Sequence, residues 1–146
     1  MKYLLDEQLD EVVAESMTPI GTKFGDEFIH ILAIRDQGTP DQEIPVLCRN
    51  EGAECLISAN IRDFGARKFY YQALLTEGLH VVVLRPGKGK FYEEEQLSLL
   101  SRSYRRIRSI TGTDTEPRML ACTPSNVRDR SIEDLIEEFD RGRSLP

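Results

Sequence analysis

The sequence predicts an α/β fold: a three-layer α/β/α sandwich in which helices cover both faces of a mainly parallel sheet of four or five strands. Short apolar runs rich in β-branched residues alternate along the chain with segments whose apolar residues recur at helical spacing. The pair of strand and helix occurs four times, and this alternation is typical of parallel sheets with right-handed crossovers. With 146 residues, the chain is long enough for one domain with its own core.

The first strand is expected at residues 2–5. From Glu7 onward, apolar residues recur at helical spacing, which predicts an amphipathic helix that stops before Pro19, because proline fits poorly inside a helix. The apolar residues of this helix are Leu9, Val12, Val13 and Met17. A turn is expected at residues 21–25.

A second strand is predicted at residues 28–34, since this run is rich in β-branched residues and suits a strand buried on both faces. Thr39 and Pro40 have the marks of a helix start, a hydroxyl N-cap followed by proline in the first turn. Pro45 interrupts this pattern, so the segment begins either as a separate turn or as a kinked helix. A third strand is expected at residues 55–58.

The second half of the chain contains a predicted helix at residues 67–77, the clearest strand at 80–84 and the longest helix at 93–109. Residues 112–130 show no clear period, and we expect them to run over the surface. We therefore divide the chain into an α/β domain, residues 1–110, and a C-terminal extension. The extension covers residues 111–146 and ends in a helix packed on the same domain, whose apolar stripe is Ile132, Leu135, Ile136 and Phe139.

Charge and cysteine content narrow the class of protein. The net charge of −6 argues mildly against a protein that coats nucleic acid, because non-specific affinity for phosphate chains comes mainly from Lys and Arg. Three cysteines without paired spacing indicate free thiols and a reducing compartment, so we expect a cytoplasmic protein. No stretch approaches the roughly 20 apolar residues needed to span a bilayer, and membrane insertion is not expected.

Acidic and amide side chains follow several predicted strands or open the next helix. They are Asp6, Asp36, Asp41, Glu43, Asn60 and Asp63. The carboxyl ends of parallel strands lie along one edge of the sheet, so such side chains can meet in one crevice. Hard divalent cations such as Mg²⁺ and Mn²⁺ prefer these oxygen ligands. The pattern therefore predicts a metal site at this edge.

Five segments, taken in their order and spacing, carry a resemblance to a known family. They are LLDEQL at residues 4–9, IRDQG at 34–38, PDQEI at 40–44, LISAN followed by DFG at 56–65, and VVVLR at 81–85. The N-terminal two thirds of the chain resembles a PIN-like ribonuclease domain, the fold used by the toxin halves of many bacterial toxin-antitoxin pairs. The resemblance implies an RNA-cleaving enzyme that uses Mg²⁺ or Mn²⁺ and is neutralised by a small antitoxin protein.

The resemblance also assigns residues. Asp6 matches the first acid of the family and Asp41 or Glu43 the second. The third position departs from the pattern: the family shows two aspartates one residue apart, whereas here Asn60 and Asp63 are separated by two residues. An amide oxygen can bind a metal but adds no charge, so a ligand role of Asn60 would lower metal affinity.

The resemblance implies a catalytic set of Asp6, Asp41 and Asp63, with Glu43 and Asn60 as further metal ligands. We expect one face of the longest helix to bind the RNA phosphates, because guanidinium groups bind phosphate through two parallel hydrogen bonds. This face presents Arg102, Arg105 and Arg106, with Arg108 nearby. The apolar stripe of the last helix suits a homodimer or a bound antitoxin.

Each assignment has a structural alternative. Asp6 can cap the first helix, and Asp41 can serve only as an acid favoured by the helix dipole. Glu43 can be a solvated helix residue, Asn60 and Asp63 are common turn residues, and the arginine face can be solvated. At the level of function, the alternatives are a PIN-like binding or scaffold module without activity, and another phosphate-handling α/β enzyme such as a phosphatase or receiver. The sequence has no Gly-rich phosphate loop to favour the latter.

Overall fold

The computed structural model describes residues 1–59, 68–87, 90–112, 116–131, 133–134 and 137. Within these residues six strands form one sheet: β1 (Lys2–Leu5), β2 (Glu27–His30), β3 (Cys55–Ser58), β4 (His80–Leu84), β5 (Met119–Cys122) and β6 (Val127–Asp129). Their order across the sheet is β2-β1-β3-β4-β5-β6. The first five run parallel and β6 runs antiparallel to β5, so the sheet is mixed and mostly parallel, as predicted, but larger.

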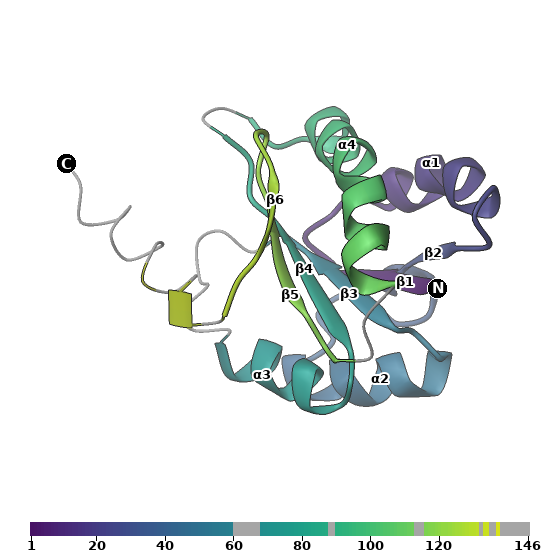
Figure 1. The fold of residues 1–146 in the computed structure, drawn as a ribbon. Coiled ribbons are helices and arrows are strands. Elements are labelled where there is room, and N and C mark those ends of the chain that lie inside the picture. Colours follow the sequence, from purple (N-terminus) through teal and green to yellow (C-terminus); the bar gives the residue numbers. More distant parts are fainter. Residues whose placement is uncertain (60–67, 88–89, 113–115, 132, 135–136, 138–146) are drawn as a thin grey trace.

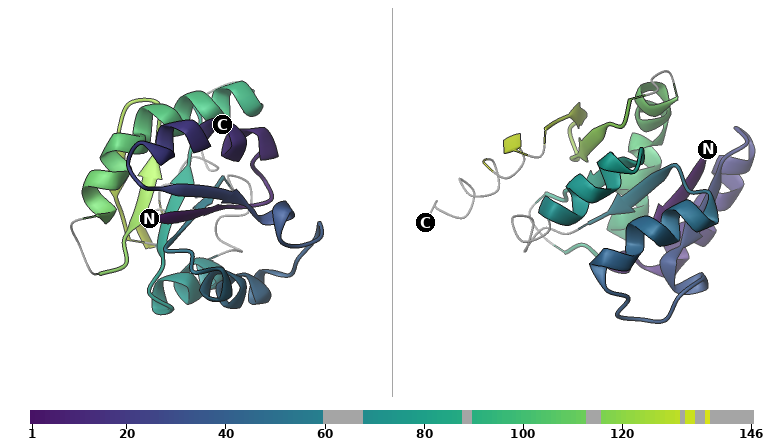
Figure 2. Two further views of the ribbon diagram at one scale, coloured as in Figure 1. Left: turned by 90° about the vertical axis from the view of Figure 1, so that its right-hand side faces the viewer. Right: turned by 90° about the horizontal axis from the view of Figure 1, so that it is seen from below.

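Helices cover both faces of the sheet, which confirms the three-layer fold. The longer helices are α1 (Glu11–Thr22), α2 (Ile44–Glu51), α3 (Lys68–Thr76) and α4 (Glu93–Thr111). Figure 1 shows α1 and α4 on one face and α2 and α3 on the other, and the two turned views in Figure 2 agree. None of the described helices is long and apolar enough to cross a membrane.

The core is divided between the two faces because successive strand residues point to opposite sides. Leu5, Ile57 and Val82 belong to the buried cluster under α1 and α4. Leu4 and Leu56 belong to the cluster under α2 and α3. Central strands are buried throughout, as expected for a parallel sheet with both faces covered.

The first helix starts later and ends later than the sequence suggested. Asp10 is its N-cap, since the Asp10 carboxylate accepts the Val12 N–H at 2.9 Å. Pro19 lies inside the helix, on its exposed side. The last turn is held by tertiary packing: Gly21 is pressed against Phe28, where a Cβ atom would come within 2.8 Å of the ring. The turn therefore begins only after Thr22.

The second strand is shorter than predicted and lies at the edge of the sheet. It ends at His30, and Ile31–Ala33 form a 3₁₀ turn instead of continuing the strand. The cause is local: the His30 Nδ1 accepts the Leu32 N–H at 3.1 Å, which turns the backbone. Further on, the separate-turn alternative is confirmed, because the 3₁₀ turn Asp41–Glu43 precedes α2.

The segment expected to run over the surface contains two strands. All four residues of β5 are buried, and β5 pairs in parallel with β4. The expectation was wrong because the sequence Met-Leu-Ala-Cys has no β-branched residue and so gives no strand signal. Most of the predicted last helix lies outside the described residues, so its packing and the division at residue 110 stay predictions.

Candidate functional site at the carboxyl edge of the sheet

Asp6 lies at the switch point of the sheet. It follows β1 directly, and its N–H donates to the Ile57 carbonyl at 2.8 Å, which continues the pairing with β3. The chain crosses from β1 to β2 on one side and from β3 to β4 on the other, so the connections after these two adjacent strands run in opposite directions. Ligands of open α/β sheets bind in the crevice at such a point, beyond the carboxyl ends of the strands.

The carboxylate of Asp6 is buried, with 3% of the residue exposed, and hydrogen bonds from protein groups stabilise it. The Glu7 N–H donates to Oδ1 at 2.8 Å. The Ser58 hydroxyl donates to Oδ2 at 3.1 Å, and the Tyr70 hydroxyl is directed at the same oxygen from 3.5 Å. Because Asp10 caps α1, Asp6 is not the helix cap.

A pocket of about 430 Å³ opens beside Asp6 and brings two of the predicted acids together. Its lining residues are Asp6, Glu7, Gln8, Gln37, Thr39, Asp41 and Ile44. Asp41 lies in the 3₁₀ turn before α2, so its approach to Asp6 depends on the loop between β2 and α2. These two carboxylates are 35 positions apart in the sequence, and the fold places both at the same opening.

The Glu7 carboxylate holds the loop between β2 and α2 in place. Both oxygens of the Glu7 carboxylate accept the Gly38 N–H, at 3.0 and 3.1 Å. Gly38 has a φ of +83°, a conformation that residues with a side chain rarely adopt, so glycine is needed at this bend. The clamp holds the segment that carries Gln37 and Thr39 against the pocket.

The other predicted metal ligands are not joined to this pair by the described residues. Glu43 is exposed in the same 3₁₀ turn as Asp41, but it does not line the pocket. Asn60 and Asp63 lie outside the described residues. Among the residues that are described, no group of three His, Cys, Asp or Glu side chains is arranged to hold a metal ion.

The donor set of the pocket nevertheless fits a hard cation. The lining polar side chains offer only carboxylate, amide and hydroxyl groups, with no thiol or imidazole among them. Mg²⁺ is commonly held by one or two protein carboxylates, with water and substrate phosphate completing its coordination. Two carboxylates at one opening are therefore sufficient for this kind of site.

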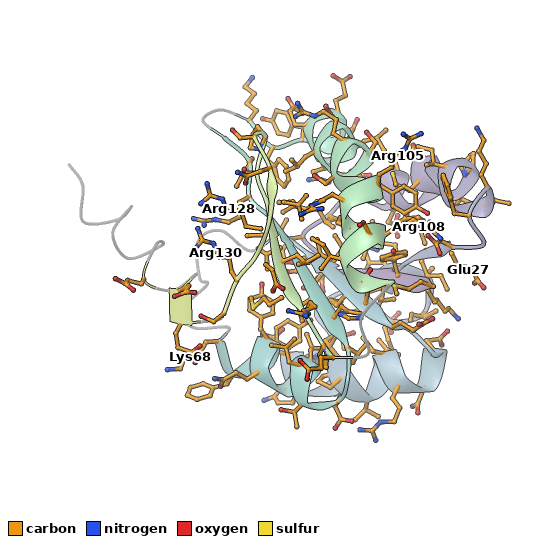
Figure 3. All side chains as sticks on the ribbon, in the orientation of Figure 1. Glu27, Lys68, Arg105, Arg108, Arg128 and Arg130 are labelled. Carbon is orange, nitrogen blue, oxygen red and sulfur yellow. The ribbon has the colours of Figure 1, made fainter. Side chains whose placement is uncertain are left out.

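The arginine face of α4 lies apart from the pocket. Arg102, Arg105 and Arg106 are exposed along this helix, and Figure 3 shows Arg105 on it. Arg102 lines a separate hollow of about 340 Å³ with Lys90 and acidic residues of the first turn. None of the three arginines is among the residues lining the Asp6 pocket, so their contact with RNA stays a prediction.

His30 holds the turn after Asp6, a role that the sequence did not indicate. The ring is buried, its Nε2 lies 2.6 Å from the Leu9 carbonyl, and its Nδ1 accepts the Leu32 N–H. These two contacts together require the neutral tautomer with the proton on Nε2, because a carbonyl can only accept. His30 thus ties the end of β2 to the Asp6–Leu9 turn.

The three cysteines are free, as predicted, and the structure shows that all three are buried. Burial raises the pKa of Cys48 to about 12, with the negative charge of Asp6 adding to the shift. Burial likewise raises the pKa of Cys122 to about 12 and that of Cys55 well above its ordinary range. A thiol in this state is neither a nucleophile nor a metal ligand at neutral pH.

Comparison with known proteins adds one finding to this geometry. The model of a family described as a PIN like domain matches residues 1–86, which is more than half of the chain. This match covers Asp6, Asp41 and the first four strands. No curated protein and no solved structure matched the chain in the corresponding comparisons.

Proposed function

The chain belongs to the PIN-like domain family, part of a nuclease superfamily, and we propose that it is a metal-dependent endoribonuclease. The observation that carries the proposal is the pocket at the switch point of the sheet, which places Asp6 and Asp41 at one opening. Divalent metals are typical of PIN domains, and the oxygen-rich lining suits them.

In this proposal Asp6 and Asp41 hold the cation, and Glu43, Asp63 and Asn60 remain candidates for further ligands. A bound Mg²⁺ or Mn²⁺ would polarise the scissile phosphate and lower the pKa of a bound water. The protein itself contributes a fixed Asp6 carboxylate, buried and hydrogen-bonded, and a loop clamped by Glu7 that carries Asp41 to the same place. Such pre-arranged anionic groups bind a cation without first having to be ordered.

We also propose a finer biological role, the toxin of a bacterial toxin-antitoxin pair that a small antitoxin protein neutralises. Support for this role comes from the sequence resemblance described above. Cytoplasmic action fits the three free, buried thiols. A homodimer is the other assembly that the sequence suggested. The molecular mass in solution, measured with and without a co-expressed neighbouring small protein, would distinguish a homodimer from a complex with an antitoxin.

A second candidate is a PIN-like binding or scaffold module without nuclease activity. One sequence feature favours it, the amide of Asn60 at a position where the family carries an acid. Metal affinity separates the two functions, because an enzyme must bind Mn²⁺ through these carboxylates, whereas a scaffold has no such requirement.

The test is cleavage of a mixed single-stranded RNA by purified protein in Mn²⁺, repeated with a chelator. We expect cleavage by the parent and none by Asp6→Asn or Asp41→Asn. The matched control is Asp36→Asn, which removes an exposed carboxylate near the pocket that does not line it. If the parent neither cuts RNA nor binds Mn²⁺ in calorimetry, the nuclease proposal is wrong and the scaffold is favoured.

A further inference from the structure

Two fully buried hydroxyl groups connect in series to the carboxylate of Asp6. Ser58 is the last residue of β3 and is fully buried. Its Oγ lies 3.1 Å from Asp6 Oδ2 and 3.1 Å from the hydroxyl of Tyr71, which is also fully buried and belongs to α3. Three elements of the fold therefore meet at one carboxylate.

The chemistry of the groups sets the direction of the hydrogen bonds. An ionised carboxylate only accepts, and a serine hydroxyl has a single proton to donate. Ser58 also lies 3.4 Å from the Gln8 Oε1, but the shorter contact to the charged Asp6 is the stronger one. With the Ser58 proton directed at Asp6, Tyr71 must donate to Ser58. The chain runs from Tyr71 through Ser58 to Asp6.

Packing alone does not account for the hydroxyl of Tyr71. The ring lies in the apolar cluster under α2 and α3, beside residues such as Leu56, Leu74 and Val83. Phenylalanine would fill this space equally well, and burying a hydroxyl costs free energy unless it finds a hydrogen-bond partner. Among the described residues the Tyr71 hydroxyl lies 3.1 Å from Ser58, which contacts Asp6, so it is placed to act on the position of Asp6.

We infer that Tyr71 and Ser58 are positioning residues that fix the Asp6 carboxylate in the orientation that holds the cation. The inference rests on the proposed function. Groups that hydrogen-bond to metal ligands orient them, and their removal commonly lowers metal affinity or activity about 10- to 100-fold. Tyr70, directed at the same oxygen from 3.5 Å, is a weaker third contact.

The first experiment measures Mn²⁺ affinity by calorimetry. We expect Tyr71→Phe and Ser58→Ala to bind Mn²⁺ about tenfold or more weakly than the parent, and Ser58→Thr, which keeps the hydroxyl, to restore most of the affinity. Tyr104→Phe is the matched control, because it removes another buried tyrosine hydroxyl, one bonded to Asp26 on the other face. Parent-like affinity in both Tyr71→Phe and Ser58→Ala would overturn the inference.

A second measurement does not depend on metal. The melting temperatures of the parent, Ser58→Ala, Asp6→Ala and the double variant form a double-mutant cycle. This cycle measures the coupling between the Ser58 and Asp6 side chains. We expect the double variant to melt higher than the sum of the two single losses predicts, and additive losses would overturn the hydrogen-bond chain. If the parent binds no Mn²⁺, the proposed function falls, and this cycle still decides whether Ser58 holds Asp6.

Discussion

Arg108 of α4 donates a 2.7 Å hydrogen bond from Nε to the buried carboxylate of Asp26, which directly precedes β2. The Tyr104 hydroxyl and the N-terminal ammonium of Met1 donate to the same carboxylate. The guanidinium of Arg108, labelled in Figure 3, also lies 4.7 Å from the centre of the Phe24 ring. This arginine joins α4 to the turn between α1 and β2.

Asp26→Asn is expected to destabilise the protein by about 3 kcal/mol, because it leaves buried donors without their anion. Urea unfolding at pH 7 measures the effect. Glu27→Gln, a change at the exposed neighbouring residue, is the control and should alter the free energy of unfolding by less than about 0.5 kcal/mol. Equal stability of the two variants would show that the Asp26 network contributes nothing.

The same network predicts a pH dependence. Burial by itself would raise the pKa of Asp26, but the hydrogen bonds from Tyr104, the N-terminal ammonium and Arg108 outweigh it and hold the pKa below its ordinary value. A lowered folded-state pKa gives stability that is complete above the unfolded-state pKa, near 4, and is lost as the pH falls through the folded value.

The difference in unfolding free energy between the parent and Asp26→Asn should therefore be constant above about pH 5 and shrink below about pH 4. Urea midpoints collected from pH 7 to pH 3 give this curve. A difference that grows on acidification would contradict the direction of the pKa shift.

The buried thiols give a prediction about reactivity. Because burial raises the pKa of Cys48 and Cys122 to about 12 and that of Cys55 well above its usual range, the thiolate forms are scarce at pH 8. We expect negligible reaction of the folded protein with an aromatic disulfide reagent at pH 8, and reaction of three thiols after unfolding in guanidinium. Rapid labelling of a thiol in the folded protein would contradict this burial.

Glu7 can be distinguished as a loop clamp or as a metal ligand. Glu7→Gln keeps an oxygen that accepts the Gly38 N–H, so a clamp predicts Mn²⁺ affinity within about threefold of the parent. Glu7→Ala removes the acceptor and should weaken Mn²⁺ binding about tenfold, because the loop that carries Asp41 is released. Equal losses in the two variants would show that the charge of Glu7, and not its clamp, is what matters.

The sequence predicted the elements that have a strong local signal. The strands β1, β3 and β4 lie where apolar runs indicated them, and Asp6 and Asp41 share a pocket because each lies beyond the carboxyl end of a parallel strand. Elements held by tertiary packing were missed. The continuation of α1 through Pro19 and the strand β5 depend on packing against other elements of the fold, which no local pattern shows.

The side chains that contact Asp6 could not be predicted from the sequence either, because tertiary packing sets these contacts. The sequence places Ser58 at the end of the strand predicted at residues 55–58 and Tyr71 in the helix predicted at 67–77. The packing of α3 near β3 brings the Tyr71 hydroxyl within 3.1 Å of Ser58, which in turn contacts Asp6. Their contact is set by how the two elements pack, so neither residue has a spacing that reveals it.

The proposed function requires a divalent cation to bind in the pocket between Asp6 and Asp41. Bound Mn²⁺ is paramagnetic and broadens the NMR signals of nearby nuclei, so a titration of labelled protein shows where it binds. We expect the amide signals of Glu7, Gln37 and Thr39 to broaden first and those around Asp26, at the other end of the sheet, to stay sharp. Uniform broadening, or broadening centred elsewhere on the protein, would contradict cation binding at Asp6 and Asp41.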